Sequence, residues 1–190
     1  VLGRVLGVVD EDTTLIVLSD HGFAPFYRAF SLNSWLAREG YVTLTDDSES
    51  EFFENVDWKG TRAYGVGFNG LYLNTKGREA GGIVTEEERG ALLEEITEKL
   101  LAVKDPKNGE RVVTKIYRAE DIYSGPFLED APDLVIGYNS GYRASWETVL
   151  GSFSKDILRD NAQKWSGDHL IEADPAPGVH RGNKKIAPPR

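Results

Sequence analysis

Two Asp-His pairs are the residues of this sequence best suited to metal chemistry: Asp20-His21 and Asp168-His169. A carboxylate oxygen and an imidazole nitrogen together suit zinc, manganese or iron. Ions held in this way can polarise a phosphoryl oxygen and lower the pKa of a nucleophile. The alternative for either pair is an ordinary turn in which the carboxylate only accepts hydrogen bonds.

The first pair directly follows an apolar run, residues 13–18, that is rich in β-branched side chains. Such a run predicts a central strand of a parallel sheet, buried on both faces. Because ligands of open α/β sheets bind just beyond the carboxyl ends of strands, Asp20 and His21 would lie where chemistry is favoured. Residues 131–137 predict a second buried strand, which the chain enters through Pro132.

Further patterns predict helices and short strands around these two runs. Apolar spacing in residues 1–9 is typical of the last turns of a helix. Ser31 is suited to cap a helix that ends near Gly40, and Thr85 with Glu88 forms a capping box that opens another. Short strands are predicted at 41–44, 61–64, 71–73, 112–117 and near 178–179, with Asn69-Gly70 as a hairpin turn.

Length, charge and composition exclude several classes of protein. The 190 residues suffice for one domain or for a large piece of a bigger one. A net charge of -9 disfavours binding to polymeric nucleic acid. The absence of cysteine excludes disulfides and cysteine nucleophiles but leaves the compartment open. No apolar window reaches the roughly 18 residues of a membrane span, and oligomeric state is not indicated.

The first residue is Val1 rather than methionine, and the opening helix pattern looks like the end of a longer helix. We therefore expect a portion of a longer polypeptide. No internal repeat and no low-complexity linker interrupt the sequence, so all 190 residues are expected to form a single α/β unit.

Two segments carry a family resemblance: residues 14–23 (Thr-Leu-Ile-Val-Leu-Ser-Asp-His-Gly-Phe) and residues 165–169 (Trp-Ser-Gly-Asp-His). They resemble the type I phosphodiesterase and nucleotide pyrophosphatase branch of the alkaline phosphatase superfamily. Residues 29–36 with 40–41, residues 69–74, and residues 123–126 with 131–134 are similar to the same branch. The resemblance runs in order through nearly the whole chain.

The resemblance implies the C-terminal part of an alkaline-phosphatase-like mixed or parallel sheet flanked by helices, with residues 41–130 as a possible inserted α+β subdomain. It also implies a metal-dependent hydrolase of phosphodiester or pyrophosphate bonds in small, nucleotide-like substrates. The resemblance further implies two divalent metal ions as cofactors, either zinc or alternatively manganese. By resemblance, Asp20 and His21 ligate one ion and His169 the other, and Asp168 has a supporting role.

The sequence departs from the family pattern in what it lacks. Family members also carry an upstream aspartate, a Thr or Ser nucleophile and an Asp-x-x-x-His pair. The residues four positions before the three histidines are Val17, Trp165 and Ala176, so that pair is absent. We expect the nucleophile and the remaining ligands to precede Val1 and the chain alone to be inactive. His180 is expected to be a surface or packing residue.

Three further residues are candidates for a substrate pocket: Phe23, Asn69 and Arg143. Phe23 follows the first Asp-His pair, and Asn69 either faces the site or only sets a hairpin. Arg143 lies between Tyr142 and Trp146, where it either holds a phosphate and a stacked base or makes a structural hydrogen bond.

Two other classes of function remain open from the sequence. A phosphomutase, a sulfatase or a phosphonate hydrolase of the same superfamily could use similar metal turns. A non-catalytic binding domain, in which both Asp-His pairs are structural, is the other. The expected partner in the leading hypothesis is a small phosphate ester.

Overall fold

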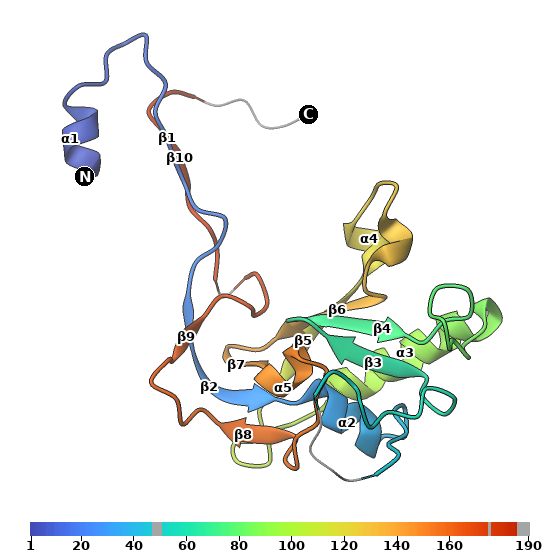
Figure 1. Ribbon diagram of the computed structural model, residues 1–190. Coiled ribbons are helices and arrows are strands. Elements are labelled where there is room, and N and C mark those ends of the chain that lie inside the picture. Colours follow the sequence, from blue (N-terminus) through green and yellow to red (C-terminus); the bar gives the residue numbers. More distant parts are fainter. Residues whose placement is uncertain (47–50, 175, 186–190) are drawn as a thin grey trace.

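A long arm projects from the body of the protein and carries α1, β1 and β10 (Figure 1). The computed structural model describes residues 1–46, 51–174 and 176–185. In the arm, β1 (Ile16–Leu18) pairs antiparallel with β10 (His180–Gly182), and α1 (Leu2–Leu6) lies near its tip. No helix among the described residues is both long and apolar enough to span a membrane.

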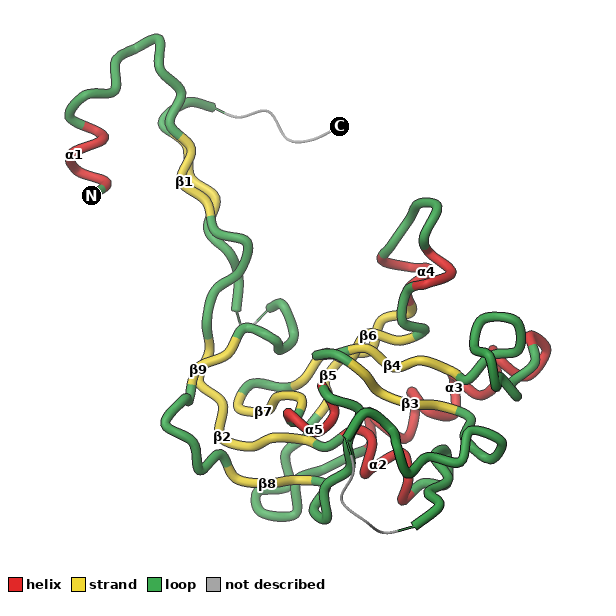
Figure 2. The backbone as a smooth tube through the Cα atoms, viewed as in Figure 1, coloured by secondary structure: helices red, strands yellow, loops and turns green. Residues whose placement is uncertain are grey.

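One sheet of the body has the strand order β3-β4-β6-β5, with antiparallel neighbours throughout. The long helix α3 packs against β5. Because α3 buries one face against this sheet, it forms one wall of the core (Figure 2). The elements are β3 (Ala63–Val66), β4 (Gly70–Leu73), α3 (Glu86–Ala102), β5 (Val113–Arg118), α4 (Ala119–Ile122), the 3-10 turn Leu128–Asp130 and β6 (Leu134–Tyr138).

The second sheet of the body is built around β2 (Ala24–Phe30), which continues directly from the arm. The strand β7 runs parallel to β2, and β8 runs antiparallel on its other side. The two-residue strand β9 pairs antiparallel with the first residues of β2. The other elements are α2 (Leu32–Arg38), β7 (Gly141–Ala144), α5 (Trp146–Val149), β8 (Leu158–Asp160) and β9 (Gly167–Asp168).

A single hydrophobic core connects the two sheets. It includes Phe30 from the second sheet, Leu71 and Ile136 from the first, and Leu93 from α3, all of which are fully buried. The core therefore contains residues from inside and outside the range 41–130. An inserted subdomain over that range stays a prediction.

Several predicted elements are confirmed. The hairpin around Asn69 is formed by β3 and β4, and the second buried strand is β6. Thr85 caps α3, with its hydroxyl accepting from the N–H of Glu88 and the Glu88 carboxylate accepting in return. Ser31 stands at the N-cap of α2, although its hydroxyl bonds to that of Ser34 instead of capping the backbone.

The prediction for residues 13–18 is wrong in its partner and in its burial. The strand found there, β1, pairs only with β10 among the described residues, and Ile16 and Leu18 are 46% and 68% exposed. An apolar run indicates that a strand is suited to burial, but it does not specify what covers it. Because the arm stands away from the body, neither face of β1 is packed against the core (Figure 1).

The α/β class is confirmed, whereas an alkaline-phosphatase-like mixed or parallel sheet flanked by helices stays a prediction for the described residues. They form three small sheets, in which β2 and β7 are parallel and the other paired strands are antiparallel. The strand expected at 41–44 is also absent there. The N–H groups of Tyr41 and Val42 bond to the carbonyl of Leu36 and close the end of α2, so they are not free for a ladder.

Candidate metal centre

The turn that carries Asp20 and His21 is held by the segment that leads into β10. The N–H of Ser19 donates to the carbonyl of Val179 at 2.8 Å, and the N–H of Val179 donates to the Ser19 hydroxyl at 2.8 Å. On the other side of the turn, the N–H of Gly22 donates to the carbonyl of Ala176 at 2.9 Å. These three bonds fix the backbone around the first Asp-His pair.

Two glycines allow this close approach of the chains. A Cβ on Gly22 would lie 2.8 Å from the carbonyl oxygen of Pro177, and a Cβ on Gly178 would lie 2.6 Å from that of Ser19. Backbone atoms cannot move aside as a flexible side chain can. The turn therefore requires glycine, which has no Cβ, at both positions.

Pairing of β9 with β2 brings the second Asp-His pair to the same place. Asp168 is opposite Ala24, which follows the turn containing His21 by only a few residues. The Asp168 carboxylate accepts hydrogen bonds from the N–H groups of His169, at 2.7 Å, and of Leu170, at 3.0 Å. This carboxylate thus fixes the start of the segment that carries the His169 ring.

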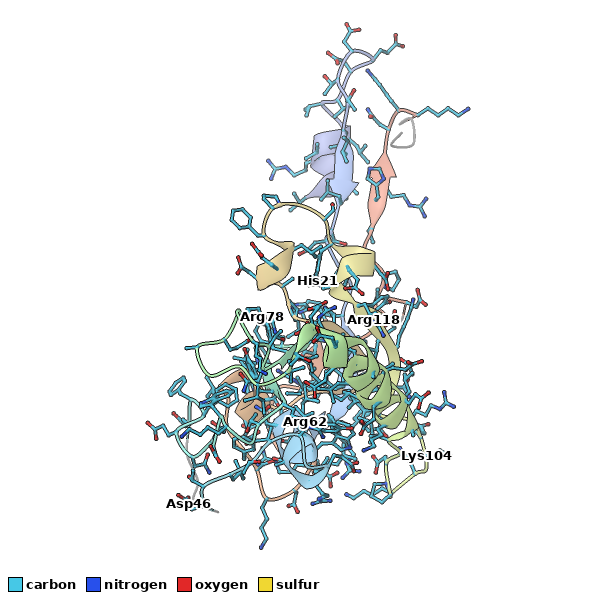
Figure 3. The ribbon with its side chains drawn as sticks, turned by 90° about the vertical axis from the view of Figure 1, so that its right-hand side faces the viewer. His21, Asp46, Arg62, Arg78, Lys104 and Arg118 are labelled. Carbon is cyan, nitrogen blue, oxygen red and sulfur yellow. The ribbon has the colours of Figure 1, made fainter. Side chains whose placement is uncertain are left out.

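The imidazoles of His21 and His169 stack, with their ring centroids 3.9 Å apart and their planes within 6°. Phe23 meets both rings edge-on, at centroid distances of 5.6 and 5.4 Å. Figure 3 shows His21 where the arm joins the body. The structure therefore brings together the two histidines that the sequence singled out, while their role as ligands stays a prediction.

The donor atoms of Asp20 and His21 lie close together. The Nδ1 atom of His21 lies 2.9 Å from the Gly22 carbonyl, which fixes the ring and leaves Nε2 free, as in metal-bound histidines. That Nε2 atom lies 3.4 Å from Oδ2 of Asp20. Two ligands of a tetrahedral zinc ion, with bonds of about 2.1 Å, lie roughly 3.4 Å apart, so this pair fits one ion.

His169 has a nitrogen without a partner. Its Nδ1 atom is buried and makes no hydrogen bond to any described residue, and the nearer Asp168 oxygen is 3.9 Å away. A buried nitrogen without a protein partner is available to an ordered water or an ion, so Nδ1 is the atom through which His169 would bind one.

The described residues supply only part of each coordination shell. Among them, no three His, Cys, Asp or Glu side chains are arranged to hold one ion. The side chain of Asp20 is 86% exposed and that of His21 33% exposed, so the pair is open to an incoming ion or ligand. His180 is exposed on the arm strand β10, as expected of a residue outside the site.

The three candidates for a substrate pocket differ in what they contact. Phe23 is 70% exposed beside the two imidazoles. Asn69 donates to the carbonyls of Ile136, at 2.6 Å, and of Leu170, at 3.4 Å, so it ties the His169 segment to β6. Its Oδ1 atom is buried without a hydrogen-bond partner among the described residues.

Arg143 makes a structural ion pair instead of an open contact to the site. Its side chain is only 6% exposed, and its Nη1 atom lies 2.7 Å from Oδ2 of Asp168. It also borders an open hollow of about 990 Å³ together with Trp146 and Trp165. Sequence reasoning missed the Arg143–Asp168 pair, because nothing in the spacing of the two residues signals that their strands flank β2.

The matched region of the family comparison covers most of the chain. Residues 1–150 match the model of the type I phosphodiesterase / nucleotide pyrophosphatase family. This region includes Asp20, His21 and Arg143, whereas His169 lies beyond it. No match is found among curated proteins or among solved structures.

Proposed function

Because the chain belongs to the type I phosphodiesterase / nucleotide pyrophosphatase family, we propose that it forms part of a metal-dependent hydrolase of phosphodiester or pyrophosphate bonds. Asp20 and His21 bind one divalent ion, His169 binds the second, and zinc is the expected metal, with manganese as the alternative. The observation that carries this proposal is the stack of His21 on His169, 3.9 Å between centroids.

Two bound divalent ions would polarise the phosphoryl oxygens, lower the pKa of a nucleophile and stabilise the leaving oxygen. The residues of this chain orient the metal-binding side chains and supply negative charge to the site. The Gly22 carbonyl orients the His21 ring, and Asp20 contributes a carboxylate. The nucleophile and the remaining ligands come, in this proposal, from a segment that precedes Val1.

The proposed substrate is a small, nucleotide-like phosphate ester. Phe23 offers an exposed aromatic face beside both imidazoles, against which an aromatic or heterocyclic group can pack. A polymeric nucleic acid is not expected, because the net charge of the chain is -9.

The test is hydrolysis of bis-p-nitrophenyl phosphate by the intact protein with added zinc or manganese. The substitution Asp20→Ala should lower kcat/KM by about 100-fold, the equivalent of roughly 2.7 kcal/mol of transition-state stabilisation. His180→Ala, which changes an exposed histidine of the arm, should leave it unchanged. The proposal fails if the wild-type protein leaves the diester intact with either metal, or if Asp20→Ala retains the wild-type rate.

A further inference from the structure

We propose that Arg143 is a positioning residue for His169 and acts through the carboxylate of Asp168. The inference rests on the proposed function to the extent that His169 is a metal ligand. It concerns a residue that touches neither the proposed ions nor the proposed ligand rings, and it assigns to Arg143 a role other than phosphate binding.

The guanidinium of Arg143 is held in place by contacts that do not involve Asp168. It lies over the ring of Phe26 at 5.1 Å and over that of Trp146 at 4.7 Å, measured from Cζ to each ring centroid. Its Nε–H donates to the carbonyl of Ala144 at 3.0 Å. Because a planar guanidinium stacked on aromatic rings has little freedom to turn, its remaining donors point in a fixed direction.

The remaining donors of Arg143 point toward the carboxylate of Asp168, which lies across the strand β2. Arg143 lies on β7 and Asp168 on β9, and both strands pair with β2. The two side chains are 6% and 7% exposed, and Nη1 of Arg143 lies 2.7 Å from Oδ2 of Asp168. A carboxylate buried to this degree needs polar partners, and the guanidinium of Arg143 is the one that holds Oδ2 of Asp168 in place.

The second oxygen of Asp168 then acts on the ligand segment. Oδ1 accepts from the N–H groups of His169 and Leu170, while Oδ2 is engaged by Arg143. The carboxylate is therefore a bridge between a fixed cation and the backbone at His169. Without the cation, we expect the carboxylate to turn toward water and to release both N–H groups, which would let the His169 ring drift from its stack on His21.

The low exposure of Arg143 favours this role over a direct contact with substrate. A phosphate would have to reach a guanidinium that is 6% exposed and already paired with Asp168. It would also have to compete with a carboxylate at hydrogen-bond distance in a poorly solvated place, where such pairs are strong.

The experiment compares Arg143→Met and Arg143→Lys with the wild type in the intact protein, using two readouts. Zinc affinity is measured by competition with a chromophoric chelator, and hydrogen exchange of peptides that span residues 167–170 is measured without metal. Arg143→Met should weaken zinc binding by about 10-fold or more and should speed exchange at His169 and Leu170. Arg143→Lys keeps the charge and should recover part of both effects.

Arg89→Met provides a matched control. Arg89 also pairs with a buried carboxylate, that of Asp133, at 3.0 Å, but it lies on α3 beside the first sheet. Because Asp133 keeps a second cation, Arg78, at 2.7 Å, the loss of Arg89 should destabilise the fold less than the loss of Arg143 does. It should leave both zinc affinity and exchange of residues 167–170 as in the wild type. If Arg143→Met does not fold, Asp168→Ala, which removes both the partner of Arg143 and the acceptor of the His169 and Leu170 N–H groups, takes its place with the same expected effects.

The proposal is overturned if Arg143→Met folds, binds zinc within about twofold of the wild type and exchanges residues 167–170 at the wild-type rate. It is also overturned if Arg89→Met produces the same changes as Arg143→Met. Should the wild-type protein take up no zinc, the proposed function fails, and the exchange measurement alone decides whether Arg143 positions His169.

Discussion

The imidazole rings of His21 and His169 stack face to face, although they lie near opposite ends of the sequence. The strand β2 is what joins them. Its first residue, Ala24, follows the turn that holds His21 and is also the partner of Asp168 in β9. The site therefore depends on one strand register and on one turn.

The substitution Gly22→Ala should weaken zinc binding. The added Cβ would lie 2.8 Å from the carbonyl oxygen of Pro177, so the turn must move away from the segment that holds it. Overpacking of this kind costs about 1–3 kcal/mol, and we expect a loss of zinc affinity of at least about fivefold, at the low end of that range. The measurement is chelator competition on the intact protein.

Gly3→Ala is the control for Gly22→Ala. It lies in α1, on the same arm, and its added Cβ would meet no described heavy atom within 4 Å. It should bind zinc as the wild type does. Equal zinc affinity for Gly22→Ala and Gly3→Ala would show that the contact with Pro177 does not hold the turn in place.

The substitution Gly90→Ala should stabilise the fold. Gly90 lies within α3, and a Cβ there meets no described heavy atom within 4 Å. Because alanine favours the helix and reduces the freedom of the unfolded chain, the free energy of unfolding should rise by about 0.5–1 kcal/mol. Urea denaturation measures this, and a lower midpoint than in the wild type would contradict the placement of Gly90 on an open helix face.

The buried carboxylate of Asp105 should make stability depend on acid pH. Burial raises the pKa of Asp105, but hydrogen bonds from the Lys107 N–H, the Arg28 guanidinium and the Tyr142 hydroxyl outweigh it, and the pKa is lowered overall. A group whose pKa is lowered by folding stabilises the protein above its unfolded pKa, and this contribution is lost as the pH falls through the folded value.

Asp105→Asn should therefore lower the free energy of unfolding at pH 7 and lower it less below about pH 3.8, the ordinary value for this group. Urea unfolding at pH 7 and pH 3 measures the difference, with the exposed Asp12→Asn as the control. A deficit that is equal at both pH values would mean that the charge of Asp105 does not contribute.

Local signals in the sequence were enough to predict the features that depend on residues close together in the chain. The capping box of Thr85 and Glu88 marks the start of α3, and the Asn69-Gly70 step marks the hairpin, because capping and tight turns involve neighbouring residues. The apolar run before Asp20 predicted a strand but not its exposure. Burial depends on partners far away in the chain, and periodicity does not specify them.

The meeting of His21 and His169 could be expected from the sequence, whereas the contacts that hold their segments in place could not, and the role of both residues as ligands stays a prediction. The Asp-His pairs are recognisable from their residue types, and the family resemblance implies that His21 and His169 lie close together. The bridge from Arg143 through Asp168 arises from the pairing of β7 and β9 with β2, a feature of topology. The need for glycine at position 22 likewise depends on a segment that returns from the far end of the chain.

The zinc content of the intact protein after equilibrium dialysis, measured by plasma mass spectrometry, tests whether Asp20, His21 and His169 bind two ions. We expect two zinc ions per chain in the wild type and in His180→Ala, and one in His169→Ala. A wild-type protein without zinc, or a His169→Ala variant that retains two ions, would contradict this expectation.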